Sequence, residues 1–410
     1  MSMRMAILGA GPIGLEVALA AAERGMDFTL YEASLSVAGN VRSWGHVQLF
    51  TPWDLNLSPR ARAALARVGR EPPSGEGCPT GAEMVDLVFE PLSKLPTIAP
   101  HIRYGSRVVD IGRDRMVKSD AIGTGARADH PFRLLLRDPE GVEWVEHADL
   151  VLDCTGAYEH PNALGSGGIP APGERAAEEY IIRRIPDLEA PFLTGDTPGW
   201  GDQRILLVGA GHSAQTTARD LEELVDRHPA TRVIWVVRSP TPTFGAIEDD
   251  VLPARCSLTE HARRLTGPDS PFDVRLGRTV DALEPSPEGI VVTLRPGDGS
   301  RENVTVDRII SLTGSVGEAR MYRQLQIHEC WATSGPMKLA ASLLASSSAD
   351  CMTQSSHGVE TLKNPEPNFY ILGSKSYGRN NTFLMRIGWE QVDEVFSTLN
   401  AVESTAAETP

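Results

Sequence analysis

Two glycine-rich stretches have the composition and spacing of loops that hold a pyrophosphate group. They read GAGPIG at residues 9–14 and GAGHSA at residues 209–214. In such a loop the first glycine permits a tight turn and the second leaves room for the phosphates. The third position, where alanine is tolerated, lets helix and strand pack closely. We therefore expect cofactor contacts at Gly9, Gly11, Pro12, Ile13 and Gly14, and at Gly209, Gly211, His212, Ser213 and Ala214.

The residues on either side of each loop predict a strand, a helix and a second strand. Around the first loop these elements are expected at 4–8, 15–24 and 28–31, and around the second at 204–208, 215–224 and 233–237. Gly25 is typical of a helix end. A helix that starts in such a loop offers free N–H groups and the positive end of its dipole to an anion. The chain thus contains one internal repeat of a dinucleotide-binding unit.

The residue that ends the second strand differs between the two repeats. In the first repeat it is Glu32, placed to accept hydrogen bonds from both hydroxyls of a ribose. In the second it is Arg238, where an acidic residue would repel a 2′-phosphate and a guanidinium can grip it. The second loop is therefore predicted to prefer NADPH to NADH. The alternative is that Arg238 is an ordinary solvated arginine.

Composition narrows the class of protein. The 410 residues allow two or three domains, and a net charge of −15 argues against nucleic-acid binding. No apolar run reaches the roughly 18–20 residues that span a bilayer. Five cysteines stand far apart without a CxxC pair, which favours a reducing cytoplasm. We find no spacing typical of metal ligands, and we expect no metal and no membrane.

With both loops, Asp153-Cys154-Thr155-Gly156 and Thr313-Gly314, the chain resembles the two-dinucleotide-binding-domain flavoproteins. This superfamily includes flavin-containing and N-hydroxylating monooxygenases and thioredoxin-reductase-like enzymes. The resemblance runs from Met5 to about Leu399 and implies FAD on the first loop and NADPH on the second. It implies an α/β fold of two Rossmann-like domains, the second inserted in the first. The expected limits are 1–165 and 326–400 for the FAD domain, with an insertion at 39–102, then 166–325 for the NADPH domain and a flexible tail at 401–410.

The resemblance also implies contacts near the flavin. Thr155 and Gly156 would form the crossover between domains, close to FAD, and the returning strand would end at Gly373. In relatives an aspartate follows this glycine and binds the ribityl chain, whereas here Ser374 follows it. The remaining cofactor contacts that we expect are Val108, Thr313 and Gly314.

Two further segments are placed around the flavin. Residues 39–48 would return over the isoalloxazine, where Trp44 could pack and Arg42 or His46 could bond a flavin oxygen; the alternative is a surface loop anchored by a tryptophan. Residues 377–384 lead into a helix predicted at 382–399, which would direct Thr382, Phe383 and Leu384 to the flavin. There Asn380 and Asn381 are candidate substrate or nicotinamide contacts, and with His46 they are the candidate catalytic residues. The alternative is that Asn381 or Thr382 only caps the helix.

Within the superfamily, the missing CxxC pair argues against dithiol chemistry. The region 180–201 also lacks the FxGxxxHxxxW pattern of Baeyer–Villiger enzymes. The expected activity is an NADPH-driven monooxygenase that uses O₂ and a flavin C4a-hydroperoxide on a nitrogen or sulfur centre of a small molecule. The alternatives are an NADPH:acceptor oxidoreductase, with a disulfide, quinone or protein acceptor, and a non-catalytic flavin- or nucleotide-binding sensor. A homodimer is left open.

Overall fold

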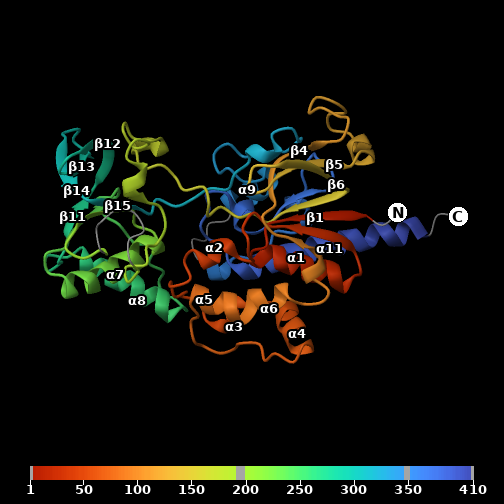
Figure 1. Ribbon diagram of the computed structural model, residues 1–410, viewed down its shortest axis with the longest axis horizontal. Coiled ribbons are helices and arrows are strands. Elements are labelled where there is room, and N and C mark those ends of the chain that lie inside the picture. The colour runs from red at the N-terminus through yellow and green to blue at the C-terminus, as the bar shows by residue number, and fades with distance from the viewer. Residues whose placement is uncertain (1–2, 191–198, 346–350, 408–410) are drawn as a thin grey trace. The chain divides into compact units, whose positions relative to one another are not determined.

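The computed structural model describes residues 3–190, 199–345 and 351–407. The chain forms two compact units (Figure 1). The first contains Met1–His160 and Val316–Pro410, and the second contains Pro161–Ser315. Because the residues of the second unit stand in the sequence between the two segments of the first, the fold is an α/β fold with one Rossmann-like unit inserted in another, as the sequence predicted.

The first unit is built on a parallel sheet. Its described strands follow the order β16-β7-β1-β2-β3, with bounds Phe369–Ile371, Leu150–Asp153, Arg4–Leu8, Asp27–Tyr31 and Ile102–Arg103. An antiparallel sheet has the order β4-β5-β6, with bounds Arg107–Arg113, Phe132–Arg137 and Glu143–Ala148. Side chains alternate along β1, so that Met5 and Ile7 join the core beneath the helices, while Ala6 and Leu8 join the core beneath the antiparallel sheet. The unit therefore has three layers.

Helices cover one face of this parallel sheet. The main ones are α1 (Pro12–Glu23) and α11 (Met385–Ala407), which pack on each other. The predicted insertion folds into α2 (Gly39–Arg42), α3 (Trp53–Asn56), α4 (Pro59–Arg67), α5 (Gly81–Met84), the π-helix η1 (Val85–Phe89) and α6 (Glu90–Ser93). After the second unit come α9 (Met337–Ala345), α10 (Val359–Leu362) and the 3-10 helix η8 (Gly373–Tyr377).

The second unit repeats the same plan. Its described parallel strands follow the order β11-β10-β9-β15-β8, with bounds Asp273–Leu276, Arg232–Val237, Arg204–Val208, Arg308–Ser311 and Ile181–Ile182. Helices α7 (His212–Arg227) and α8 (Pro253–Leu265) cover one face, and an antiparallel sheet of β12 (Arg278–Ser286), β13 (Gly289–Pro296) and β14 (Glu302–Val306) covers the other. The internal repeat thus extends well beyond the glycine loops and their flanking elements.

Several predicted details differ in the structure. The last helix, predicted at 382–399, begins at Met385 and continues to Ala407. Residues 401–407 lie within the bounds of this helix, while 408–410 lie outside the described residues. Trp44 and Trp53 in the insertion are half-buried against the core. No helix in the described ranges is both long and apolar enough to cross a membrane.

A half-buried arginine ties the insertion to the rest of the first unit. Arg60 in α4 bonds Glu16 in α1, lies 2.9 Å from Glu23 Oε2, and lies 2.6 Å from Asp393 Oδ1 in α11. The Glu16 side chain is only 3% exposed, and burial raises the pKa of its carboxyl, while the Ser58 hydroxyl and Arg60 oppose that shift. The charged Glu16 therefore depends on Arg60 as its counter-charge.

We expect R60M to lower the free energy of unfolding by about 3 kcal/mol, because it leaves Glu16 buried without its partner. The control is R67M, because Arg67 is 65% exposed and forms a longer ion pair with Glu23, at 3.5 Å. R67M should lower the free energy of unfolding by roughly 0.5 kcal/mol or less. Urea unfolding of both variants measures the difference. Similar losses in the two variants would contradict the assigned role of Arg60.

Candidate functional site

In the first glycine loop, close packing requires glycine at two of the three glycine positions. Gly9 has φ +92°, and a Cβ there would lie 3.0 Å from the carbonyl oxygen of Cys154. A Cβ on Gly14 would overlap the carbonyl oxygen of Gly9. Gly11 is different, because a Cβ there would meet no heavy atom within 4 Å. The fold thus requires Gly9 and Gly14, while Gly11 faces open space where a ligand can approach.

The helix after this loop presents an open N-terminus. Gly11 is the N-cap of α1, no side chain caps it, and no acidic residue lies in the first turn. The free N–H groups and the helix dipole therefore remain available to an anion. Ile13 points the other way: it is buried against Gly373 and Gly388, where added Cβ atoms would crowd it. Ile13 can therefore contribute its backbone to a ligand, while its side chain locks the loop against α11.

Glu32, at the end of β2, braces the glycine loop. One carboxylate oxygen accepts the Ala10 N–H at 2.6 Å, and the other accepts the Ser34 N–H at 2.8 Å. Each oxygen retains a second lone pair that could accept a ribose hydroxyl. Because the carboxylate already has backbone partners, the predicted contact with the ribose stays a prediction. Ser106, two residues before Val108, donates its N–H to the Glu32 carbonyl at 2.8 Å and brings the start of β4 beside β2.

The ends of β7 and β16 complete this edge of the first unit. The two strands are parallel neighbours, with Ile371 opposite Asp153. A Cβ on Gly156, which has φ +71°, would lie 3.7 Å from Ser374 Oγ. Thr155 and Ser374 are both exposed. The structure therefore brings Thr155, Gly156 and Ser374 together beside the first loop, at the carboxyl edge where ligands bind in open parallel sheets.

The insertion residues near this site have protein partners. Arg42 donates from Nε to the Val37 carbonyl at 3.0 Å and forms an ion pair with Glu90 at 2.6 Å. A bond from Arg42 to a flavin oxygen would compete with these partners and stays a prediction. Trp44 packs on Gly81, with its ring 6.5 Å from that of Tyr158. His46 is exposed, and no hydrogen bond or ion pair of its side chain is found within the described ranges.

The segment before α11 is held by a local turn. The Asn380 side-chain oxygen accepts the Thr382 N–H at 2.9 Å and the Thr382 hydroxyl at 2.8 Å. This turn competes with helical hydrogen bonding, which explains why α11 begins three residues later than predicted. Phe383 and Leu384 pack partly against the core. Asn381 remains exposed, so its predicted contact with substrate or nicotinamide stays open.

The second loop has the same geometry as the first. Gly209 has φ +137°, and a Cβ there would overlap the Leu312 carbonyl oxygen, whereas a Cβ on Gly211 would meet nothing within 4 Å. Gly211 is the uncapped N-cap of α7, which has no acidic residue in its first turn. Ala214 is fully buried beside Gly209, where the third glycine stands in the first loop. The open position therefore recurs in both repeats.

Other predicted residues of the second unit lie around this loop. Burial, followed by the charge of Arg255, lowers the pKa of His212 at the start of α7, which favours a neutral imidazole. Ser213 is exposed. Thr313 donates its hydroxyl to the Asn162 carbonyl at 3.0 Å, and the Asn162 N–H bonds Gly314 O at 2.9 Å. Thr313 and Gly314 thus follow β15 as Thr155 and Gly156 follow β7.

Arg238 stands free at the end of β10. It is exposed, and its side chain has no hydrogen bond or ion pair in the part of the chain that the structure describes. A guanidinium with five unused donors suits a phosphate. In the acidic run 248–250, in contrast, Asp250 forms a buried ion pair with Arg255 at 2.6 Å.

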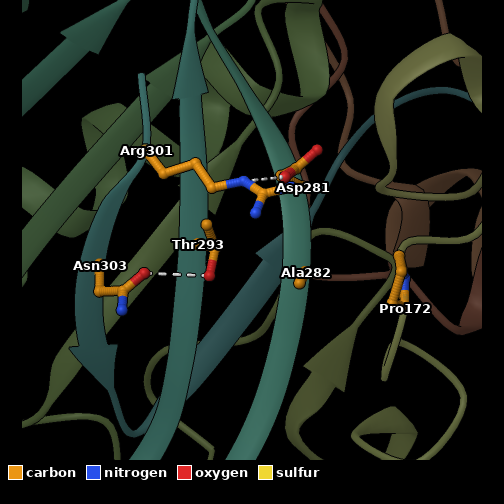
Figure 2. Close-up of a pocket in the computed structure, with 6 residues that line it drawn as sticks. All are labelled: Pro172, Asp281, Ala282, Thr293, Arg301 and Asn303. Carbon is orange, nitrogen blue, oxygen red and sulfur yellow. Dashed lines mark hydrogen bonds and ion pairs between the residues drawn. The ribbon is translucent and has the colours of Figure 1, made fainter. Parts of the chain in front are cut away.

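A surface hollow in the second unit does not coincide with these residues. Figure 2 shows it on the antiparallel sheet of β12, β13 and β14, lined by Pro172, Asp281, Ala282, Thr293, Arg301 and Asn303. Its polar groups bond one another: Arg301 lies 2.9 Å from Asp281, and Thr293 lies 3.0 Å from Asn303. None of the predicted cofactor contacts lines it, and its charges are already paired.

One buried pair was missed from the sequence. Lys375 Nζ lies 2.6 Å from Asp153 Oδ2, directly beneath the edge formed by Thr155, Gly156 and Ser374. A signal was present, because opposite charges stand at the ends of two segments predicted to be strands. Local patterns do not reveal that β7 and β16 are neighbours.

These features form two Rossmann-like units, one inserted in the sequence of the other, and several solved structures share this fold over nearly the whole chain. The bacillithiol disulfide reductase of Bacillus cereus has a TM-score of 0.67 at 15% identity, covering 98% of this chain and 99% of its own. The ornithine N-hydroxylase of Kutzneria sp. 744, with reduced FAD, NADP⁺ and L-ornithine, has 0.62 at 14%, covering 98% and 100%. The thioredoxin reductase of Lactococcus lactis has 0.60 at 15%, covering 97% and 99%. No protein-family model matches the sequence, and no curated protein matches it.

The open position at Gly11 gives a paired prediction. We expect G11A to fold like the wild type without cofactor but to bind FAD at least about tenfold more weakly, because the added methyl occupies ligand space. G14A should instead lower the melting temperature of the cofactor-free chain, since its Cβ would overlap the Gly9 carbonyl oxygen. FAD titration and thermal unfolding separate the two effects. Wild-type FAD affinity in G11A would contradict this reading of the loop.

Proposed function

We propose that the chain is an NADPH-driven, FAD-dependent monooxygenase that transfers one oxygen atom from O₂ to a nitrogen or sulfur centre of a small molecule. One observation carries the cofactor part of this proposal. Gly11 and Gly211 are glycines that the surrounding protein does not require, and each stands at an uncapped helix N-terminus. A dinucleotide pyrophosphate at both positions explains both features.

The chain's own residues would bind and orient the cofactors. In the first unit the loop from Gly9 to Gly14, with Thr155, Gly156 and Ser374, would hold FAD. In the second unit the loop from Gly209 to Ala214 would hold the pyrophosphate of NADPH, and Arg238 its 2′-phosphate. Bound FAD supplies the electron transfer and oxygen chemistry, so the protein needs few acid–base groups of its own.

The cysteines support oxygen transfer over a dithiol relay. Cys154 lies against the first loop, where burial raises the pKa of its thiol well above the usual value. A thiol that stays protonated is a poor nucleophile. This favours a reaction that does not pass electrons through a cysteine beside the first loop.

A second candidate function is an NADPH:acceptor oxidoreductase. Cys330 favours it, because the Thr333 side chain and nearby backbone N–H groups lower the pKa of this thiol. The turn that contains Cys330 is bonded to the segment before α11, where Arg379 N–H donates to the Thr333 carbonyl at 2.7 Å. The bacillithiol disulfide reductases that share this fold point to the same class of reaction.

Arg238 gives a test of cofactor preference. We expect R238A to raise the KM for NADPH roughly 10- to 100-fold and to leave that for NADH unchanged, because only the 2′-phosphate loses a charge-assisted partner. The control is R232A at the other end of β10, whose guanidinium bonds the Pro229 carbonyl at 2.7 Å. Steady-state oxidation of both nucleotides measures the effect. Equal changes for NADPH and NADH in R238A would contradict a 2′-phosphate contact.

The reaction itself is tested by anaerobic reduction of the FAD-loaded protein with NADPH, followed by rapid mixing with O₂. A monooxygenase should reoxidise in two phases, with a transient absorbing species before oxidised flavin returns. Reoxidation in one phase, with fast turnover of artificial electron acceptors and slow turnover in C330S with disulfides, would favour the second candidate. No reduction by either nucleotide would contradict both candidates.

A further inference from the structure

A buried ion pair lies directly beneath the residues that would hold FAD. Asp153 ends β7, and Lys375 lies in η8 immediately after β16, so both stand at the carboxyl edge of the parallel sheet. The Lys375 ammonium lies 2.6 Å from Asp153 Oδ2, and their side chains are 3% and 0% exposed. The residues above the pair are Thr155, Gly156 and Ser374.

The pair controls the conformation of Thr155. Asp153 Oδ1 accepts the Thr155 N–H at 3.0 Å and the Thr155 hydroxyl at 2.7 Å. The same hydroxyl oxygen accepts a hydrogen bond from Lys375 Nζ at 3.1 Å. Thr155 is therefore held through its backbone and its side chain at once, which fixes the start of the turn into Gly156.

The surroundings hold Lys375 in place. Its aliphatic stem packs on Gly317, where a Cβ would overlap the Lys375 Cγ. Its ammonium lies 5.0 Å from the centre of the Tyr322 ring, close enough for a cation–π interaction. Tyr322 is itself buried. These contacts fix the position of the Lys375 side chain, with its charge directed at Asp153 and Thr155.

The fold does not require charges at this place. In the second unit, β15 ends at the buried Ser311, and Thr313 is held by the carbonyl of Asn162 without an ion pair. Buried ion pairs also stabilise little compared with apolar side chains of similar size, because desolvation opposes their attraction. General stability therefore does not by itself account for the pair in the first unit.

We propose that Lys375 and Asp153 are positioning residues for FAD. The hydrogen bonds that Thr155 donates to Asp153, with Lys375 as the buried counter-charge of that carboxylate, hold Thr155 and Gly156 in the conformation that accepts the cofactor. This inference rests on the proposed function, since it assumes FAD at the first loop. Neither residue is solvent-exposed, so both act through Thr155 and Gly156 and do not contact the cofactor themselves.

Two double variants of the full chain test the proposal. K375M/D153V removes both charges and the acceptor for Thr155. Its FAD dissociation constant should rise about tenfold, which corresponds to the free energy of about one hydrogen bond. K375M/D153N is also uncharged but keeps an amide oxygen for the Thr155 N–H, so it should recover most of the affinity. FAD titration and the visible circular dichroism of bound flavin are the readouts, and thermal unfolding without cofactor shows whether each variant folds.

A matched control lies at the opposite edge of the same sheet. Arg4 on β1 pairs with Asp149 just before β7 at 3.0 Å, and R4M/D149N should leave FAD binding unchanged. A wild-type dissociation constant in K375M/D153V would overturn the inference, and so would equal losses in the two Lys375 double variants. A wild-type chain that binds no FAD would contradict the proposed function and this inference with it.

Discussion

The close approach of the first glycine loop to the end of β7 governs the arrangement of the first unit. A side chain on Gly9 would meet the Cys154 carbonyl, and one on Gly14 would overlap the carbonyl of Gly9. Because neither position carries a Cβ, α1 starts directly against the sheet. The helix N-terminus is then left uncapped at Gly11, facing space that no protein atom fills within 4 Å of a Cβ at that residue.

This contact is transmitted to parts of the chain that are far apart in sequence. Ile13 packs between Gly373 and Gly388, which joins the loop to α11. In turn, α11 carries Asp393 to Arg60, which anchors the insertion. The loop, the returning C-terminal elements and the insertion are therefore connected by direct side-chain contacts. The candidate FAD site is assembled from segments that meet only when all three are in place.

Features set by short-range patterns could be predicted from the sequence. The loops, their flanking strands and helices, and the open glycines follow from spacing alone. Features set by distant partners could not. Lys375 and Asp153 are 222 residues apart, and Arg42 and Glu90 are 48 apart, so local patterns do not reveal that either pair meets. The start of α11 was misplaced for another reason, since the Asn380 side chain stabilises a turn where helix-forming residues already begin.

Because the first unit is made of two separate segments of the sequence, it can be completed only late in synthesis on the ribosome. The second unit ends at Ser315 and can close while the first still lacks β16 and α11. Until those elements emerge, the β7 edge has no partner strand on that side and the apolar face of α1 has no covering helix. An unpaired edge beside exposed apolar surface invites association with other chains. While about a fifth of the chain is being synthesised, between β15 and α11, a complete second unit is therefore joined to a first unit that still lacks its last strand and helix.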